Sequence, residues 1–183
     1  MAESRFDGRV AVITGGGRGL GREYALLLAS KGAKVVVNDN GSAVTGDGVD
    51  AGPAEQLVRE IKAAGGEAIA STDSVATPDG GKAIIGAALN KYGRIDILIH
   101  SAGNVRYGTL DSISNEDFRA VVDVHLLGAF NVVRPAFPVM CEAGYGRVVL
   151  TGSIGGLYGA NAVVNYGVSK AASSSSGSSY QRA

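Results

Sequence analysis

Two residues near the end of the chain have types and spacing suited to acid–base chemistry. Tyr166 and Lys170 are four positions apart, so on a helix they share one face. A free tyrosine has a pKa of about 10 and is a poor base at neutral pH, but a neighbouring ammonium favours the phenolate. The pair could therefore exchange a proton with a bound molecule. Solvated Tyr-x-x-x-Lys pairs are common on helices, so the interpretation depends on what surrounds them.

A glycine-rich segment near the start of the chain could bind a dinucleotide, which would support a chemical role for this pair. After an apolar run and before a helical pattern the sequence reads TGGGRGLG, residues 14–21. Glycines permit a tight turn and let backbone N–H groups approach a pyrophosphate at the start of a helix. An ordinary strand-to-helix turn is the alternative. The candidate cofactor-binding residues of this segment are Gly15, Arg18, Gly19, Leu20 and Gly21.

An acidic residue after the second apolar run favours the dinucleotide interpretation. Asp39 ends the run 34–39, roughly 20 residues beyond the glycines, where a carboxylate can accept from the ribose hydroxyls of NAD. The same carboxylate would repel the 2′-phosphate of NADP. Arg18 acts in the opposite sense, because a guanidinium could bind that phosphate, although it could equally be a solvated side chain. We therefore expect a dinucleotide site that prefers NAD.

The elements that must position these residues follow from the hydrophobic pattern. Pro135 and Pro138 are expected to kink or divide the longest helix, which a capping box at 114–117 opens. The predicted strands are 9–15, 34–39, 67–72, 95–103 and 146–153, and the predicted helices are 19–31, 53–64, 80–92, 114–143 and one beginning near Val163.

Alternating strands and helices with fully apolar strands predict an α/β fold. The expected architecture is a three-layer, doubly wound parallel sheet (a Rossmann fold) in the strand order 3-2-1-4-5. Ligands bind beyond the carboxyl ends of such strands, at the switch point between strands one and four. This fold brings together the loops 15–21 and 100–103 and the loop that carries Ser153, whose hydroxyl could bind a substrate oxygen.

Composition restricts the classes of protein further. The 183 residues suit one domain, and 17 basic residues balance 17 acidic ones, so neither a nucleic-acid partner nor a charged tail is indicated. Cys141 is the single cysteine, which argues against a disulfide framework and a cysteine zinc cluster, and no metal site is expected. A polar start and the lack of a long apolar run predict a cytoplasmic protein without a membrane segment. The 28 glycines, about double ordinary usage, follow apolar runs, as expected where backbone approaches a ligand.

These motifs, in this order and spacing, resemble the short-chain dehydrogenase/reductase family: TGGGRGLG, HSAG, Ser153 and YGVSK. The resemblance covers about residues 6–170 and implies an enzyme that transfers a hydride between NAD(P) and a secondary alcohol or ketone. It implies that Tyr166 is the general acid/base, and that Lys170 supports it and holds the nicotinamide ribose. Ser153 would orient the substrate.

The resemblance also extends the set of cofactor residues. It implies that Asp73 contacts the adenine, although a turn or helix-capping carboxylate is an equal alternative. His100 and Ser101 stand where the family usually has two asparagines, and hydrogen bonds that tie the fourth strand to a neighbouring loop are their structural alternative. The further residues implied at the cofactor are Ser74, Ser101, Ala102 and Gly103, together with Tyr166 and Lys170.

One departure from the common family pattern is His125, which stands where an asparagine is usual. This feature and the long loop 40–52 resemble the (3R)-hydroxyacyl-CoA dehydrogenase unit of peroxisomal multifunctional enzyme type 2, which implies a 3-hydroxyacyl thioester as substrate. His125 could relay a proton from Lys170 toward solvent. Alternatively, it fixes its helix to neighbouring elements.

The second departure is the end of the sequence. Family members continue beyond the lysine with a full helix, further strands and a substrate lid, and they commonly form homo-oligomers through these late elements. Here a serine-rich tail, 171–183, follows the dinucleotide-binding domain 1–170, and its serines disfavour a helix by very roughly 4 kcal/mol. We therefore expect an irregular tail and a fold truncated after the fifth strand and the start of the following helix. The alternative function is a catalytically silent dinucleotide-binding module, or a partial copy that a partner chain completes. As a third possibility, 171–183 stand in place of a longer C-terminus.

Overall fold

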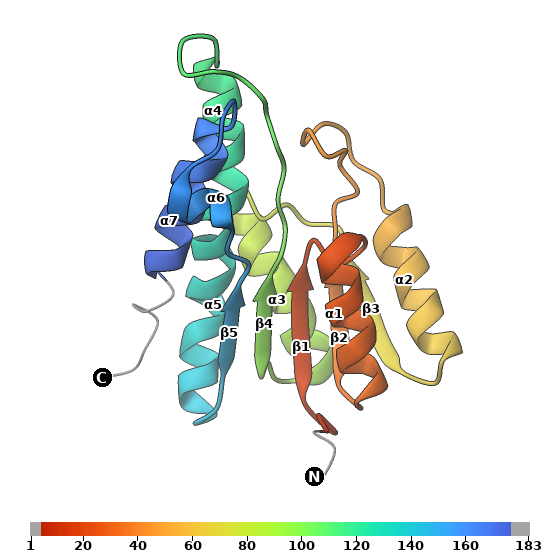
Figure 1. Ribbon diagram of the computed structural model, residues 1–183. Coiled ribbons are helices and arrows are strands. Elements are labelled where there is room, and N and C mark those ends of the chain that lie inside the picture. Colours follow the sequence, from red (N-terminus) through yellow and green to blue (C-terminus); the bar gives the residue numbers. More distant parts are fainter. Residues whose placement is uncertain (1–4, 177–183) are drawn as a thin grey trace.

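A computed structural model describes residues 5–176 and shows a parallel sheet with helices on both faces (Figure 1). The sheet has five strands in the order β3-β2-β1-β4-β5, which confirms the predicted doubly wound topology. β5 forms one edge of this sheet, and β3 forms the other. The strands are β1 (Val10–Thr14), β2 (Lys34–Asn38), β3 (Glu67–Ser71), β4 (Ile97–His100) and β5 (Arg147–Leu150).

Helices cover the sheet in two layers. α1 and α2 pack on one face, where their apolar side chains join those of β1 and β2 in one hydrophobic cluster. α3 and α5 pack on the other face and form a second cluster. The helices are α1 (Gly19–Ser30), α2 (Gly52–Ala63), α3 (Pro78–Tyr92), α4 (Asn115–Val122), the π-helix η1 (Asp123–Leu127), α5 (Gly128–Glu142), α6 (Ile154–Tyr158) and α7 (Val164–Ser176).

The central strands β2, β1 and β4 are largely apolar on both sides because both sides are covered. All five side chains of β1 are buried, and the four apolar ones alternate between the two hydrophobic clusters. β1 pairs in parallel with β2 on one side and β4 on the other, so its carboxyl end marks the switch point of the fold. The glycine segment that follows β1 therefore begins at the centre of the sheet edge where ligands bind.

The long helical stretch departs from prediction at its prolines. α4 begins as expected after Ser114, whose Oγ accepts the Asp117 N–H at 3.0 Å. The stretch is divided, but at η1, and α5 then runs without interruption through Pro135 and Pro138. A proline removes one helical hydrogen bond. The buried face of α5, which packs against α3, compensates for this loss.

The combined helical stretch Asn115–Glu142 is long and apolar enough to cross a membrane by length and composition, but 44% of its most apolar window is buried in the protein. Its buried residue Asn131 donates to the carbonyl oxygen of Val75 at 2.9 Å. α5 also packs against α3 and β4. These contacts are those of a core helix that covers one face of the sheet.

The prediction of an irregular tail from residue 171 is wrong for residues 171–176, which continue α7. Serine hydroxyls bond back to the backbone one turn earlier: Ser173 Oγ donates to Ser169 O at 2.8 Å, and Ser174 Oγ donates to Lys170 O at 2.9 Å. Ser173 is also buried, and its Oγ lies 3.3 Å from His125 O. Local bonds and burial thus offset the low helix propensity. The remaining predicted tail, 177–183, lies outside the described residues.

Candidate active site

A cleft of about 580 Å³ lies beyond the carboxyl ends of the strands, at the predicted switch point. Gly21 and Ser153 do not line it. Gly21 packs directly against Gly15, which does, and Ser153 bonds to Gly155, which lies beside Tyr166. The predicted residues that line the cleft are Gly15, Arg18, Gly19, Leu20, Asp39, Asp73, Ser74, Ser101, Ala102, Gly103, His125, Tyr166 and Lys170.

The glycine segment requires glycine for two different reasons. Gly15 has a φ of +63°, and a Cβ there would lie 2.7 Å from the Cα of Ala102, because the loops after β1 and β4 touch. A Cβ on Gly21 would lie 2.1 Å from the carbonyl oxygen of Gly15. Arg18 occupies the N-cap of α1 without a side-chain capping bond. The first N–H groups of this helix are therefore available to an anion in the cleft.

Asp39 stands at the cleft wall after β2. Its Oδ2 accepts the Gly17 N–H at 2.9 Å, and its Oδ1 accepts the Gly41 N–H at 2.8 Å. A carboxylate has about four acceptor sites, so it can still accept from ribose hydroxyls. Arg18 is exposed but attached: its guanidinium donates to the carbonyl oxygens of Ser42 and Gly41 at 3.1 and 3.3 Å. It belongs to the wall of the cleft rather than to open solvent.

Asp73 and Ser74 line the cleft beyond β3, and both also make local turn bonds. Asp73 Oδ2 accepts from Ser71 Oγ at 3.1 Å, while its backbone oxygen accepts from Asn38 Nδ2 at 2.9 Å. Ser74 Oγ accepts the Ala76 N–H at 3.3 Å. The turn role considered for Asp73 is therefore present, and its position in the cleft is compatible with a ligand contact as well.

Tyr166 and Lys170 share one face of α7, as their spacing predicts. Lys170 is 5% exposed, and its Nζ lies 5.7 Å from the centre of the Tyr166 ring. The ammonium donates to the carbonyl oxygen of Thr151 at 2.6 Å. Burial lowers the pKa of Lys170 to about 8. The positive charge of Lys170 thus lies close to the Tyr166 phenol in a largely buried environment.

Ser153 begins α6, a short helix that sequence patterns did not indicate. Its Oγ accepts the Gly155 N–H at 3.1 Å. A Cβ on Gly155 would lie 3.5 Å from Ser153 Oγ and 3.6 Å from Tyr166 Cε1. A methyl group at Gly155 would thus make ordinary van der Waals contact with both the serine hydroxyl and the phenol ring, so these two side chains lie on either side of Gly155.

His125 lies in η1 and is 3% exposed. Its Nε2 lies 2.8 Å from Asn104 O and 3.1 Å from Asn104 N. The shorter contact requires the proton on Nε2, because a carbonyl oxygen only accepts. Burial and then the Lys170 charge lower the pKa of His125 to about 4, so the ring is neutral at physiological pH. Among the described residues, no hydrogen bond joins it to Lys170.

His100 is buried in the sheet, at the end of β4. Its Nδ1 lies 2.8 Å from Thr14 Oγ1, which also accepts the Ala102 N–H at 3.3 Å. Burial lowers the pKa of His100 to about 3, so a neutral ring bonds to the threonine hydroxyl. This arrangement is structural, but the bond joins two strands rather than a strand and a loop: His100 ties the end of β4 to Thr14 at the end of β1, and Thr14 in turn holds Ala102 in the loop after β4. Sequence reasoning had assigned nothing to Thr14.

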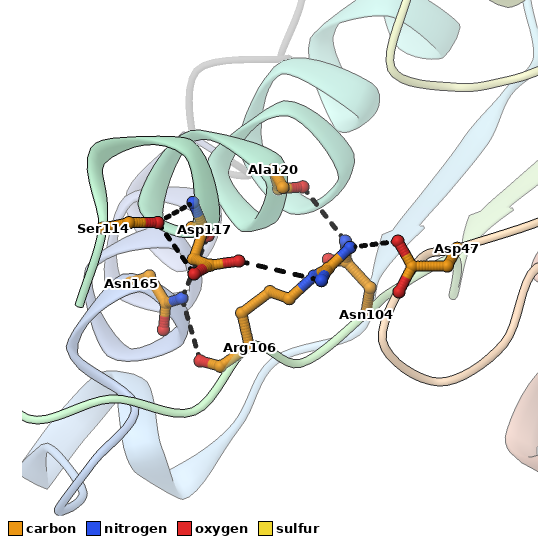
Figure 2. A network of polar contacts seen from close by, with 7 residues as sticks. All are labelled: Asp47, Asn104, Arg106, Ser114, Asp117, Ala120 and Asn165. Carbon is orange, nitrogen blue, oxygen red and sulfur yellow. Dashed lines mark hydrogen bonds and ion pairs between the residues drawn. The ribbon is translucent and has the colours of Figure 1, made fainter. Parts of the chain in front are cut away.

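Four more residues at the site had not been singled out from the sequence. Thr151 supplies the carbonyl that holds Lys170. Asn104, Arg106 and Asn165 belong to the polar network drawn in Figure 2, and Asn165 Oδ1 also accepts the Tyr166 N–H. Only the position of Asn165 directly before Tyr166 could have drawn attention to any of them. Among residues 5–176, no group of three or more metal-ligating side chains converges.

Comparison with known proteins assigns the fold and its site to a family. A family model described as short chain dehydrogenase matches residues 9–181. The chain belongs to this family. Over 166 residues it is 50% identical to peroxisomal multifunctional enzyme type 2 of Drosophila melanogaster. That alignment covers 91% of this chain and 27% of the relative, so the chain spans about a quarter of the relative's length.

Two solved structures extend the comparison to bound cofactors. A metagenomic short-chain oxidoreductase in complex with NADP is similar with a TM-score of 0.86 and 29% identity, covering 94% of this chain and 75% of the other. A 7α-hydroxysteroid dehydrogenase complexed with NADH and 7-oxo glycochenodeoxycholic acid is similar with a TM-score of 0.85 and 31% identity, covering 93% and 63%. The family binds a nicotinamide dinucleotide, and the glycine cradle and the uncapped start of α1 in this chain fit one.

Proposed function

We propose that this chain is the nucleotide-binding and catalytic part of an oxidoreductase that interconverts a secondary alcohol and a ketone. The observation that carries the proposal is the pairing of Tyr166 with buried Lys170 on one face of α7, at the wall of the cleft. Ser153 supports it, because only Gly155 separates its hydroxyl from the Tyr166 ring. α7 also continues beyond Lys170, which favours an enzyme over a silent module.

In the direction of oxidation, the Tyr166 phenolate accepts the hydroxyl proton of the alcohol. Lys170 favours the phenolate through its positive charge, and Thr151 O holds the ammonium in place. Ser153 donates to the substrate oxygen, where charge changes during the reaction. The bound dinucleotide supplies the hydride acceptor, or the donor in reverse. In reduction, Tyr166 returns the proton to the new alkoxide.

NAD is the cofactor we propose in preference to NADP. Asp39 supports this choice, because its carboxylate would repel a 2′-phosphate. Two backbone N–H groups, one to each oxygen, hold this carboxylate at the cleft wall. Arg18 is the competing residue, but its guanidinium donates to the carbonyl oxygens of the loop after β2. A phosphate would have to displace these bonds.

We propose a 3-hydroxyacyl thioester as the substrate, on the basis of His125 and the long loop 40–52. A proton relay through His125 stays a prediction. Its alternative, a positioning role, has more direct support, because the ring bonds to Asn104 and contacts the Tyr166 ring. The partner expected is a small-molecule substrate, with a homo-oligomer as the family expectation. The cytoplasmic location also stays a prediction, and relatives named as peroxisomal argue against it.

The proposal is tested by reduction of acetoacetyl-CoA with NADH, followed as loss of nicotinamide absorbance. We expect turnover that falls by about 10²- to 10⁴-fold in Tyr166→Phe, while NADH affinity stays within about twofold. Binding of NADH without turnover of this thioester or of simple ketones would favour the silent module. Equal rates for the native chain and the Tyr166→Phe variant would exclude Tyr166 as the acid/base.

A further inference from the structure

The loop after β2 crosses to the loop after β4. We call residues 41–50 of this loop the strap. The Val105 N–H donates to the carbonyl oxygen of Val44 in the strap at 2.9 Å. A Cβ on Gly46 would lie 2.7 Å from Asn104 Nδ2, so strap and loop are in close contact. Several strap residues line the dinucleotide cleft. The strap therefore bridges two walls of that cleft.

One guanidinium joins the strap to the other side of the cleft (Figure 2). Arg106 Nη2 lies 2.5 Å from Asp47 Oδ1 in the strap, and its Nη1 lies 3.7 Å from Asp117 Oδ1 in α4. The Arg106 side chain is 27% exposed, and its Nε is buried without a hydrogen-bond partner among the described residues. A partly buried cation is thus shared between carboxylates of two elements that are remote in sequence.

The backbone around Arg106 is also tied to the helix that carries the tyrosine. Asn165 Nδ2 donates to Arg106 O at 3.0 Å, and Asn165 Oδ1 accepts the Tyr166 N–H at 2.8 Å. Gly108 N–H donates to Ala162 O at 2.9 Å, just before α7. The segment 105–108 therefore has the strap on one side and the start of α7 on the other.

We infer that Arg106 is a positioning residue that latches the strap across the dinucleotide cleft and connects it to the start of α7. Because the strap contributes to the cleft wall, the Asp47–Arg106 pair must open for the strap to move away from a bound dinucleotide. The pair then governs how fast the strap opens and how long the dinucleotide stays. This second consequence rests on the proposed function, whereas strap opening does not.

Strap opening is measured by amide hydrogen exchange of Val105 and the strap in the cofactor-free chain. We expect Asp47→Asn to speed exchange about threefold, and added salt to speed it in the native chain but not in the variant, since salt screens an exposed pair. Arg106→Gln should have the larger effect, and Arg106→Lys should restore part of the protection because it keeps the charge. Glu55→Gln, which breaks the exposed pair with Arg59 on α2, is the matched control and should change nothing in the strap.

Asp47 carries the test even if the Arg106 variants fold poorly, because its side chain is 66% exposed. Equal strap exchange in the native chain and Asp47→Asn, with or without salt, would overturn the latch. In parallel, NADH dissociation is followed by fluorescence, and we expect about threefold faster release from Asp47→Asn. Unchanged release would also overturn the latch. If the native chain binds no NADH, the proposed function fails, while the exchange measurement still decides the latch.

Discussion

The imidazole of His125 stands edge-on to the phenol of Tyr166, with ring centroids 5.1 Å apart and an interplanar angle of 84°. His125 is thereby fixed between the proposed acid/base and the backbone of Asn104. It is one of two buried histidines at the carboxyl end of the sheet, and His100 is the other. Both rings are neutral in the folded protein, so the free energy of unfolding should depend on pH in the acidic range.

Stability should fall as the pH drops below about 6.5. The folded pKa values, about 4 for His125 and about 3 for His100, lie below the unfolded value of 6.5. At pH values between the folded and unfolded pKa values, the histidines are protonated in the unfolded chain but neutral in the folded chain. From pH 7 to pH 5 each histidine should remove about 2 kcal/mol of unfolding free energy. Urea denaturation measures this loss, and His125→Asn should remove about half of it. Equal stability at both pH values would show that neither histidine is buried as described.

Asp96 should stabilise the sheet at the amino ends of β1 and β4, opposite the cleft. It is 1% exposed and accepts from Arg9, Arg94 and the Val10 N–H at 2.6–2.9 Å. Burial raises the pKa of Asp96, but the bonds from Arg94, Val10 and Arg9 outweigh it and hold the pKa below its usual value. Its contribution is therefore present above the unfolded pKa and is lost as the pH falls through the lower folded pKa.

Asp96→Asn should cost about 3 kcal/mol of unfolding free energy at neutral pH, because two arginines lose their charged partner. The control is Asp79→Asn, which removes an exposed pair with Lys82 and should change stability by less than about 0.5 kcal/mol. Chemical denaturation of both variants compares the two costs. A loss below about 1 kcal/mol for Asp96→Asn would mean that its arginines remain well solvated without it.

Gly21→Ala should abolish dinucleotide binding or the fold of the loop, because the added Cβ would collide with Gly15 O at 2.1 Å. Gly86→Ala is the matched control: it lies inside α3 with nothing within 4 Å of the new Cβ. Alanine is the better helix former, so this variant should gain up to about 1 kcal/mol. Thermal denaturation and NADH binding of both variants test the difference. Native affinity in Gly21→Ala would contradict the close approach.

The strand order and the position of the cleft could be predicted because their signals are local and strong. The core of each central strand, such as Val35–Val37, is apolar on both faces, as strands covered on both sides must be, and it is followed by glycine or by a polar residue. Right-handed crossovers then fix the order of the strands. The loops with Gly15 and Ala102 consequently meet as expected.

Other features depend on contacts between distant residues and could not be predicted. α5 passes through Pro135 because its buried face packs against α3, and η1 has no local signature. Serines that disfavour a helix by propensity extend α7, because Ser173 is buried and bonded to the preceding turn. The Asp47–Arg106 pair joins two loops whose sequences indicate no partner.

The measurement that tests the account most directly is a fluorescence titration of the chain with NADH and, separately, NADPH, for the native sequence and for Asp39→Ser. The chain has no tryptophan, so the background is low. We expect saturable binding with NADH at least about tenfold tighter than NADPH, and loss of this preference in Asp39→Ser. Tighter binding of NADPH to the native chain, or saturable binding of neither cofactor, would contradict the assignment of the cleft.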